Sequence, residues 1–262
     1  MYKYVACDID GTLLNSAGEL TDNTRAAIAQ TLEKGCIFAL SSGRPIQGID
    51  KFISELHLRG PMITYNGAMI VDAESRKVLF SQSLDNADSR SVWDLGTALD
   101  VTMCVWADNK LYANKDNEKA EVYRRISGTS IGFVKNIEDI PSEITKILWY
   151  DEAENMPFLL EQCRKIVPPS VTFCTSRPYF LEFFSNKVSK ASALQFVCDY
   201  CGITPENILA IGDGMNDMQM IKFAGTGVVL ANGASELKQC ADFIAPSNDE
   251  DGVAAALRKF II

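Results

Sequence analysis

Two carboxylates stand two positions apart near the start of the chain. Asp8 and Asp10 follow an apolar run and precede Gly11 in "VACDIDGTLL". In an extended segment this spacing points both side chains to the same side, and Gly11 allows the backbone to turn away sharply. Two anions held this close repel each other unless a cation lies between them. Oxygen ligands favour a hard ion, so the pair indicates a magnesium site that keeps water and substrate phosphate as further ligands.

Three other polar clusters have a similar setting, each beside a predicted strand or at the start of a predicted helix. They are "SSGR" at 41–44, "SK" at 189–190 and "GDGMND" at 212–217, and Asp213 in the last of them is the obvious third carboxylate. Ser42 alone is more typical of a cap for the helix that Pro45 would begin, and Lys190 alone is more typical of a solvated helix lysine. The combination of all four clusters is what favours chemistry over turns and caps.

A calcium loop is a second interpretation of the acidic pair. Asp8, Asp10 and Glu19 fall at loop positions one, three and twelve of such a motif. However, Leu13 stands where the motif needs glycine, and a strand rather than a helix precedes it. We therefore expect magnesium.

Composition restricts the class of protein. The chain has 262 residues, 47% of them hydrophobic, which suits one large or two modest globular domains. Its net charge of −9 disfavours binding to nucleic acid or to an anionic membrane. No basic leader with an apolar core opens the chain, and no apolar stretch approaches the ~18 residues of a membrane span. Eight scattered cysteines suggest reduced thiols, so we expect a soluble, cytoplasmic protein.

The alternation of strand and helix patterns at both ends of the chain predicts an α/β protein. The fold class that follows is a doubly wound, Rossmann-like parallel sheet, in which ligands bind beyond the carboxyl ends of the strands. The expected strands are 2–8, 36–42, 61–66, 207–213, 226–231 and 242–245, with a hairpin over 68–82. The expected helices are 21–35 (capped by Thr21 or Asp22), 45–56, 189–202, 215–225, 234–240 and one from about 249.

The pattern changes near residue 84. Helices near 86–99, 116–127 and 154–166 and strands near 101–106, 144–150, 170–175 and 179–184 predict an α+β insert. We therefore expect a core domain made of 1–83 and 185–262, with 84–184 inserted as a second domain.

Four segments resemble, in order and setting, the four motifs of the haloacid dehalogenase superfamily. They are "DIDGTLLNS", "ALSSGRP", "VSKASAL" and "AIGDGMNDMQMI". More narrowly, the chain resembles the Cof-type sugar-phosphatase branch, subfamily IIB, which carries a large α+β cap (C2 cap) between the second and third motifs. The core resemblance covers about 1–82 and 185–262, and "RPYFLEFF" resembles the strand that returns from the cap.

The resemblance implies a covalent mechanism. Asp8 attacks phosphorus and becomes an aspartyl-phosphate, while Asp10 protonates the leaving oxygen and then activates water. The side chain of Asp8, the backbone carbonyl of Asp10 and the side chain of Asp213 hold Mg2+, and Asp217 supports the ion through a water or from behind these ligands.

The resemblance also implies which groups bind the phosphoryl oxygens. They are Ser42, the Gly43 amide, Lys190 and Asn216, with the backbone amide of Ile9 as a further donor.

Two of these assignments have competitors nearby. Ser41 competes with Ser42, since the family often shows a single threonine before "GR". Lys187 competes with Lys190, which we prefer because it opens a helix next to a serine. His57, the only histidine, lies outside all four clusters, which disfavours a hydrolytic triad.

These observations predict a Mg2+-dependent phosphatase that hydrolyses small phosphate monoesters, such as sugar phosphates or phosphorylated cofactors. The alternatives are a phosphotransferase or mutase with the same nucleophile and an alcohol acceptor, and a receiver-like phosphoaspartate signalling module. The expected partner is a small phosphorylated metabolite, with no nucleic acid or membrane; the oligomeric state stays open. Candidates for contacting the leaving group, for which packing in the core is the commoner role, are Trp106, Tyr112, Trp149, Arg177 and Tyr179.

Overall fold

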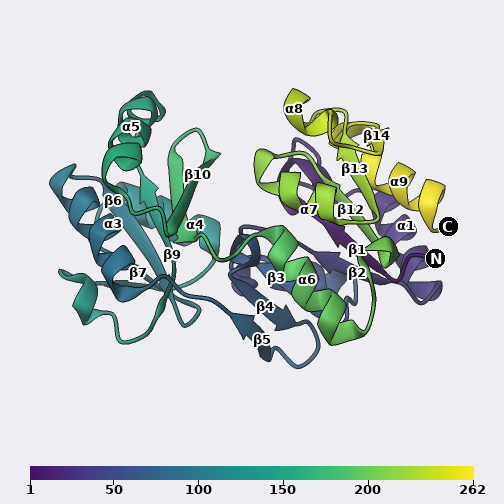
Figure 1. Ribbon diagram of the computed structural model, residues 1–262, viewed down its shortest axis with the longest axis horizontal. Coiled ribbons are helices and arrows are strands. Elements are labelled where there is room, and N and C mark those ends of the chain that lie inside the picture. Colours follow the sequence, from purple (N-terminus) through teal and green to yellow (C-terminus); the bar gives the residue numbers. More distant parts are fainter. The chain divides into compact units, whose positions relative to one another are not determined.

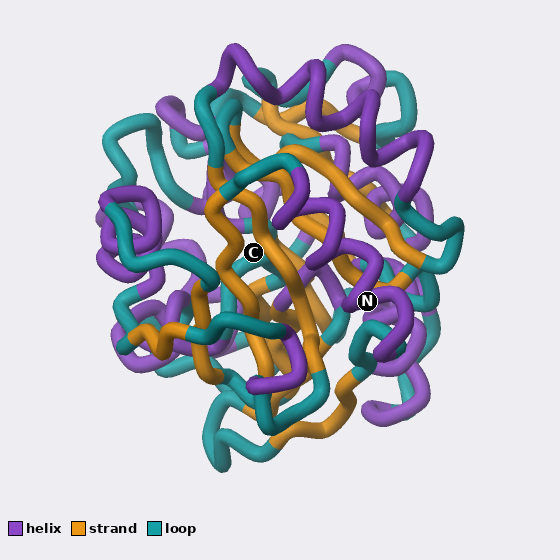
Figure 2. The backbone as a smooth tube through the Cα atoms, turned by 90° about the vertical axis from the view of Figure 1, so that its left-hand side faces the viewer, coloured by secondary structure: helices purple, strands orange, loops and turns teal.

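The computed structural model describes residues 1–262, which form both helices and strands (Figure 2). It divides into two compact units. Unit 1 comprises Met1–Gly43, Ile49–Phe80 and Ser189–Ile262, and unit 2 comprises Arg44–Gly48 and Ser81–Val188. The predicted insert, 84–184, lies within the longer segment of unit 2. None of the helices combines the length and the apolar character that a bilayer crossing requires.

The core of unit 1 is a five-stranded parallel sheet with the order β14-β13-β12-β1-β2. All four residues of β1 are fully buried, because helices cover both faces of a sheet of this kind. This confirms the predicted α/β fold with a parallel central sheet. The strands are β1 (Tyr4–Cys7), β2 (Ile37–Leu40), β12 (Ile208–Gly212), β13 (Thr226–Leu230) and β14 (Phe243–Ala245).

Helices of unit 1 pack in two pairs, α1 with α9 and α6 with α7 (Figure 1). Thr21 is the cap of α1, because its hydroxyl oxygen accepts a hydrogen bond from the backbone N–H of Thr24 at 3.1 Å. The helices are α1 (Asp22–Glu33), α2 (Asp50–Glu55), α6 (Lys190–Cys201), α7 (Met218–Phe223), α8 (Ser235–Lys238) and α9 (Gly252–Phe260).

The helix predicted over 45–56 is broken. A 3-10 turn covers Ile46–Gly48, and only then does α2 begin. Ile49, between the two, has a φ of −116°, well away from the usual helical value. The Arg44 guanidinium donates to the carbonyl of Gly48 at 3.2 Å, which satisfies a group that a continuous helix would have used. The apolar residues within 45–56 therefore correctly indicated a buried face. The prediction that one continuous helix covers this range was wrong.

A separate sheet with the order β3-β4-β5 completes unit 1, and it contains the predicted hairpin. Strands β3 and β4 are antiparallel. One parallel bridge joins Ser41 to Ile63, so the end of β3 lies beside the end of β2. The strands are β3 (Pro61–Thr64), β4 (Met69–Asp72) and β5 (Val78–Ser81).

Unit 2 is a six-stranded sheet with the order β10-β11-β9-β6-β7-β8, and its main apolar core includes residues of α3 and α5. The sequence patterns did not predict β7 and β8, because each is short and partly exposed. Its helices are α3 (Asn86–Ala98), α4 (Glu118–Ser127) and α5 (Met156–Ile166). Its strands are β6 (Thr102–Ala107), β7 (Lys110–Ala113), β8 (Ile131–Phe133), β9 (Ile144–Tyr150), β10 (Val171–Arg177) and β11 (Phe180–Ser185).

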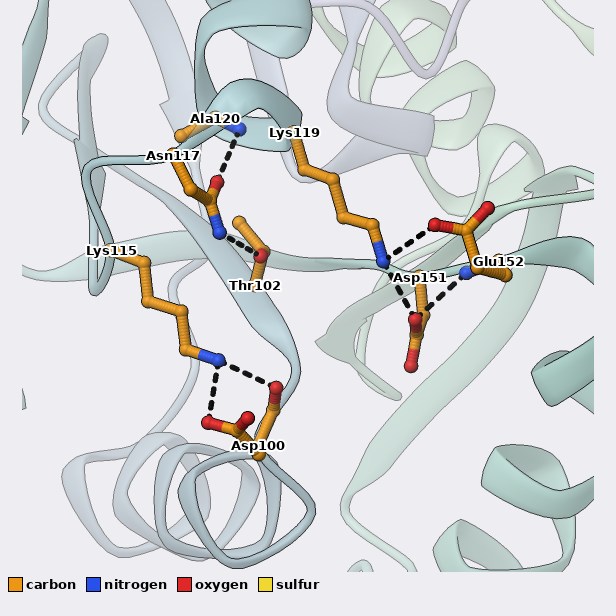
Figure 3. A network of polar contacts seen from close by, with 8 residues as sticks. All are labelled: Asp100, Thr102, Lys115, Asn117, Lys119, Ala120, Asp151 and Glu152. Carbon is orange, nitrogen blue, oxygen red and sulfur yellow. Dashed lines mark hydrogen bonds and ion pairs between the residues drawn. The ribbon is translucent and has the colours of Figure 1, made fainter.

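Polar contacts tie the start of α4 to the sheet of unit 2 (Figure 3). The side-chain oxygen of Asn117 accepts from the backbone N–H of Ala120 at 3.0 Å, and its amide donates to the Thr102 hydroxyl at 2.8 Å. In the segment between β7 and α4, Lys115 donates at 2.6 Å to both the carbonyl and the carboxylate of Asp100. These contacts fix where α4 begins relative to β6.

Candidate active site

The parallel pairing of β1 with β12 and β2 brings three motif-bearing turns to one edge of the sheet. The backbone N–H of Asp8 donates to the carbonyl of Ile211 at 2.9 Å, and that of Ser41 donates to the carbonyl of Cys7 at 2.8 Å. Asp8 therefore leaves β1 at the level where its two neighbouring strands also end. In parallel sheets this edge is where ligands bind.

Lys190 links two carboxylates at this edge. Its Nζ lies 2.5 Å from Asp8 Oδ1 and 2.6 Å from Asp217 Oδ1. All three residues are buried, with 1%, 6% and 0% of their surfaces exposed. Lys190 is the first residue of α6, and the Ser189 hydroxyl caps that helix by accepting from the backbone N–H of Ser192 at 3.1 Å. The start of the helix therefore places the lysine.

Asp213 is held from two sides. The Thr12 hydroxyl donates to Asp213 Oδ1 at 2.5 Å. Asp217 Oδ2 accepts from the backbone N–H groups of Asp213 and Gly214, both at 3.0 Å. Gly11 has a φ of +84°, and a Cβ there would stand 2.4 Å from Asp213 Oδ2. Only glycine allows the two acidic turns to approach this closely.

Three carboxylates and one lysine leave this cluster with excess negative charge. Asp8, Asp213 and Asp217 each offer an oxygen, and these atoms lie within 4.8 Å of one another. Burial raises the pKa of Asp213 to about 6. Burial also raises the pKa of Asp8, although Lys190 acts to lower it. Carboxylate oxygens that are this close and this poorly compensated fit a hard divalent cation such as Mg2+.

The carboxylates of this cluster also raise the pKa of the lysine. Burial alone would lower the pKa of Lys190, but the carboxylates of Asp217 and Asp8 outweigh it and raise that pKa well above its ordinary value. Lys190 is therefore a permanent cation at neutral pH, with its charge directed at the oxygens of Asp8 and Asp217.

Asp10 differs from Asp8 in its surroundings. Its side chain is exposed, and its carboxylate is not part of the three-carboxylate group. Residues Ile9–Leu13 form a single π-helical turn, within which Asp10 and Gly11 leave the helical dihedral angles. The side chain of Asp10 is therefore not subject to the burial that raises the pKa of Asp8, and its predicted role in proton transfer stays a prediction. Its predicted metal contact through the backbone carbonyl stays a prediction.

The second motif, "SSGR" at 41–44, contacts Asn66, a residue that the sequence analysis did not identify. The backbone N–H of Asn66 donates to the carbonyl of Ser42 at 3.0 Å. Asn216, a predicted phosphate ligand, donates through its side chain to Asn66 Oδ1 at 3.2 Å. A Cβ at Gly43 would lie 3.1 Å from Asn66 Nδ2. The available signal was the polar pair "NG" soon after the strand at 61–64, which matches the setting of the other motifs.

Of the two competing lysines, Lys190 contacts the carboxylates of the site and Lys187 does not. The two competing serines, Ser41 and Ser42, both lie at the end of β2, close to the site. Lys187 is exposed and belongs to unit 2, where it lies 3.6 Å from a carboxylate oxygen of Asp85. Ser41 and Ser42 are both buried, and the Ser41 hydroxyl has no hydrogen-bond partner. No helix begins at 45, so Ser42 is not a helix cap, and the choice between Ser41 and Ser42 as phosphate ligand stays open.

The candidate residues for the leaving group divide by burial. Trp106 and Trp149 are fully buried, and Trp149 belongs to the apolar core of unit 2. Tyr112 packs against the same core. Arg177 is exposed and donates to the hydroxyl of Tyr179 at 3.3 Å. The two tryptophans are therefore packing residues, whereas Arg177 and Tyr179 do not belong to that core.

Comparison with known proteins identifies the family. A model of the family described as haloacid dehalogenase-like hydrolase matches residues 5–257. The chain is a haloacid dehalogenase-like hydrolase. Residues 5–257 include all four motifs and the whole insert, so the predicted superfamily membership and the predicted hydrolase class are confirmed.

Several relatives of this haloacid dehalogenase-like hydrolase have phosphatase names. "Putative phosphatase YxeH" of Bacillus subtilis (strain 168) is 34% identical over 100% of this chain and 99% of that protein. The 5-amino-6-(5-phospho-D-ribitylamino)uracil phosphatase YcsE of the same organism is 31% identical over 99% and 96%. The sugar phosphatase BT4131, of subclass IIB, shares the fold with a TM-score of 0.86 at 22% identity over 98% of both chains. These similarities agree with the predicted Cof-type branch.

Proposed function

We propose that this hydrolase is a Mg2+-dependent phosphatase that hydrolyses small phosphate monoesters through an aspartyl-phosphate on Asp8. The observation that carries the proposal is the contact between Lys190 Nζ and Asp8 Oδ1 inside a group of three carboxylates. If Lys190 served only to form ion pairs with Asp8 and Asp217, no third carboxylate would be needed beside them. A nucleophile that must approach an anionic phosphate needs positive charge from more than one side.

The proposed metal ligands are the carboxylates of Asp8 and Asp213 and the backbone carbonyl of Asp10. Mg2+, when bound, supplies the charge that keeps Asp8 ionised and compensates the approaching phosphate. Asp217 supports the site from behind, since one of its oxygens accepts from Lys190 and the other from two backbone N–H groups.

The first half-reaction transfers the phosphoryl group to the protein. A carboxylate oxygen of Asp8 attacks phosphorus, the bond from phosphorus to the leaving oxygen breaks, and its electron pair stays on that oxygen. Asp10 donates its proton to the leaving oxygen, so the product departs as an alcohol. The exposed side chain of Asp10 suits this contact with substrate.

The second half-reaction restores the protein. Asp10, now ionised, takes a proton from water, and the water oxygen attacks phosphorus. The bond between phosphorus and Asp8 breaks, inorganic phosphate leaves, and Asp8 is again a carboxylate. Through both halves the phosphoryl oxygens accept hydrogen bonds from Lys190, Ser42 and Asn216, together with the backbone amides of Gly43 and Ile9.

The proposed substrates are sugar phosphates and phosphorylated cofactor precursors. YcsE, one of the relatives, has a phosphorylated ribitylamino compound as its named substrate. The net charge of −9 disfavours a large polyanion, so a small ester whose phosphate meets the local charge of Lys190 fits best.

A screen of phosphorylated metabolites, with and without Mg2+, tests the proposal on the unaltered protein and on Asp8→Asn. We expect Mg2+-dependent phosphate release that the variant lacks. Turnover by Asp8→Asn at the unaltered rate would contradict the assignment of the nucleophile. The phosphotransferase alternative predicts that substrate loss exceeds phosphate release when an alcohol acceptor is added, whereas hydrolysis predicts equal amounts.

A further inference from the structure

The turn after β13 contacts both acidic turns, although it carries none of the predicted site residues. The side-chain amide of Asn232 donates to the carbonyl of Gly11 at 2.7 Å. Two residues later, the backbone N–H of Ala234 donates to the carbonyl of Asp213 at 3.0 Å. One short segment therefore binds the backbone next to Asp10 and the backbone of Asp213.

Asn248, which follows β14, continues this set of hydrogen bonds. Its backbone N–H donates to Asn232 Oδ1 at 3.0 Å, and its side-chain amide donates to the carbonyl of Leu14 at 2.9 Å. Asn248 is 9% exposed. Hydrogen bonds thus run from Gly11 through Asn232 and Asn248 to Leu14, and they hold the middle of the π-helical turn Ile9–Leu13 and the residue that follows it.

We infer that Asn232 is a positioning residue for the Mg2+ site, with Asn248 as its support. The inference rests on the proposed function for its metal but concerns residues outside that ligand set. The backbone of the turn must present the carbonyl of Asp10 while Gly11 stays at a positive φ, and the Asp8 side chain provides no capping hydrogen bond for it. Hydrogen bonds to the neighbouring carbonyls therefore decide how much of the ligand geometry exists before the ion arrives.

Calorimetric titration with Mg2+ tests this on Asn232→Ala, which removes the donor to Gly11 and the acceptor for Asn248. We expect the dissociation constant for Mg2+ to rise about tenfold, the lower limit of the effect that is typical when a direct partner of a metal ligand is lost, because Asn232 binds the carbonyl next to a ligand rather than the ligand itself. The kcat at saturating Mg2+ should stay within about twofold, because Asn232 does not touch the reacting atoms. Asn248→Ala, which removes only the bond to Leu14, should give a smaller rise.

Asn207→Ala is the matched control. The Asn207 amide donates to the carbonyl of Met1 at 3.2 Å, and its oxygen accepts from the backbone N–H of Thr204 at 3.2 Å. It thus makes the same two kinds of bond, but at the amino end of β12, away from the acidic turns. A merely structural role predicts equal effects of Asn207→Ala and Asn232→Ala on Mg2+ binding, and that result would overturn the inference.

The remaining outcomes separate this inference from the proposed function. A dissociation constant for Asn232→Ala within about twofold of the unaltered value would overturn the inference alone, since the expected rise is about tenfold. Mg2+ binding that responds to Asn232→Ala in a protein that hydrolyses no phosphate ester would overturn the proposed function alone. Failure of the unaltered protein to bind Mg2+ would overturn both.

Discussion

Two helices in the two units begin in the same way. In unit 1, Ser189 caps α6 and Lys190 in its first turn lies 2.5 and 2.6 Å from two carboxylates. In unit 2, Asn117 caps α4 and Lys119 in its first turn lies 2.8 and 3.0 Å from two carboxylates (Figure 3). Each lysine lies in the first turn of a capped helix and contacts two carboxylates at similar distances, so these distances do not explain why only one of the clusters resembles an active site.

Burial distinguishes the two clusters. The side chain of Lys190 is 0% exposed, and its two partners are 8% and 1% exposed. The side chain of Lys119 is 28% exposed, and its partners are 18% and 67% exposed. Water therefore solvates the charges of the second cluster and is excluded from those of the first.

The two clusters shift the pKa of an aspartate in opposite directions. Burial acts to raise the pKa of Asp151, but hydrogen bonds from Lys119 and a backbone N–H outweigh it, and the pKa is lowered. For Asp8, burial outweighs Lys190, and the pKa is raised. The nearby carboxylate of Asp213 adds to this rise. In the buried cluster the negative charge of three carboxylates exceeds the positive charge of Lys190, and a further cation would compensate it. In the exposed cluster around Lys119, water solvates the charges instead.

The largest expected difference between the clusters is in catalysis. Asp8→Asn should reduce phosphatase activity by at least about 10^3-fold, because an amide cannot accept the phosphoryl group as a nucleophile. Asp151→Asn, which makes the same change beside Lys119, should leave activity close to that of the unaltered protein. Steady-state rates with an aryl phosphate check both, and comparable losses in the two variants would remove the distinction.

Removing the lysines should separate the clusters by stability. Lys190→Met leaves Asp8 and Asp217 buried without their cation and should lower the free energy of unfolding by about 3–5 kcal/mol. Lys119→Met should lower it by less than about 1 kcal/mol, because its partners are solvated. Urea denaturation of the metal-free proteins measures both values. A similar loss in the two variants would show that burial is not the deciding difference.

Mg2+ should stabilise the protein through the buried cluster alone. At a Mg2+ concentration 100 times the dissociation constant, the free energy of unfolding should rise by about 2.7 kcal/mol. Asp213→Asn should abolish this rise, since it removes a ligand, while Glu152→Gln should retain it. Thermal unfolding with and without Mg2+ provides the measurement. Stabilisation that survives Asp213→Asn would place the ion elsewhere.

The smallest expected effect is the pH dependence of metal binding. The pKa of Asp213 is raised to about 6, so below that pH a proton occupies the carboxylate that Mg2+ requires. Binding at pH 5 should be about tenfold weaker than at pH 8. The folded state without metal also binds more protons than the unfolded chain between about pH 4 and 6, so its stability should fall as the pH rises through that window.

Carboxyl NMR titration of the metal-free protein checks this pH dependence directly. Asp213 should titrate near pH 6, while Asp151 should titrate below its ordinary value because hydrogen bonds lower its pKa. An ordinary pKa at Asp213 would contradict the link between burial and metal binding.

The sequence by itself determined the strands of the parallel sheet and the motifs at their ends. Apolar runs such as 4–7 are fully buried, because a central parallel strand is covered on both faces. The motif positions followed, since carboxyl ends of parallel strands share one edge. Gly11 was also readable as a turn, and its positive φ agrees. These features depend on local periodicity and on backbone preferences, which a sequence displays directly.

Only the tertiary structure decided which charges are buried and which distant groups meet. Lys190 and Lys119 have similar local patterns, and nothing within a few residues of either indicates that one is excluded from water. The contact of Asn66 with Asn216 and that of Asn232 with Gly11 join segments far apart in the chain. Burial and such hydrogen bonds depend on how the whole chain packs, and that packing sets the pKa values and the charge surplus on which the chemistry depends.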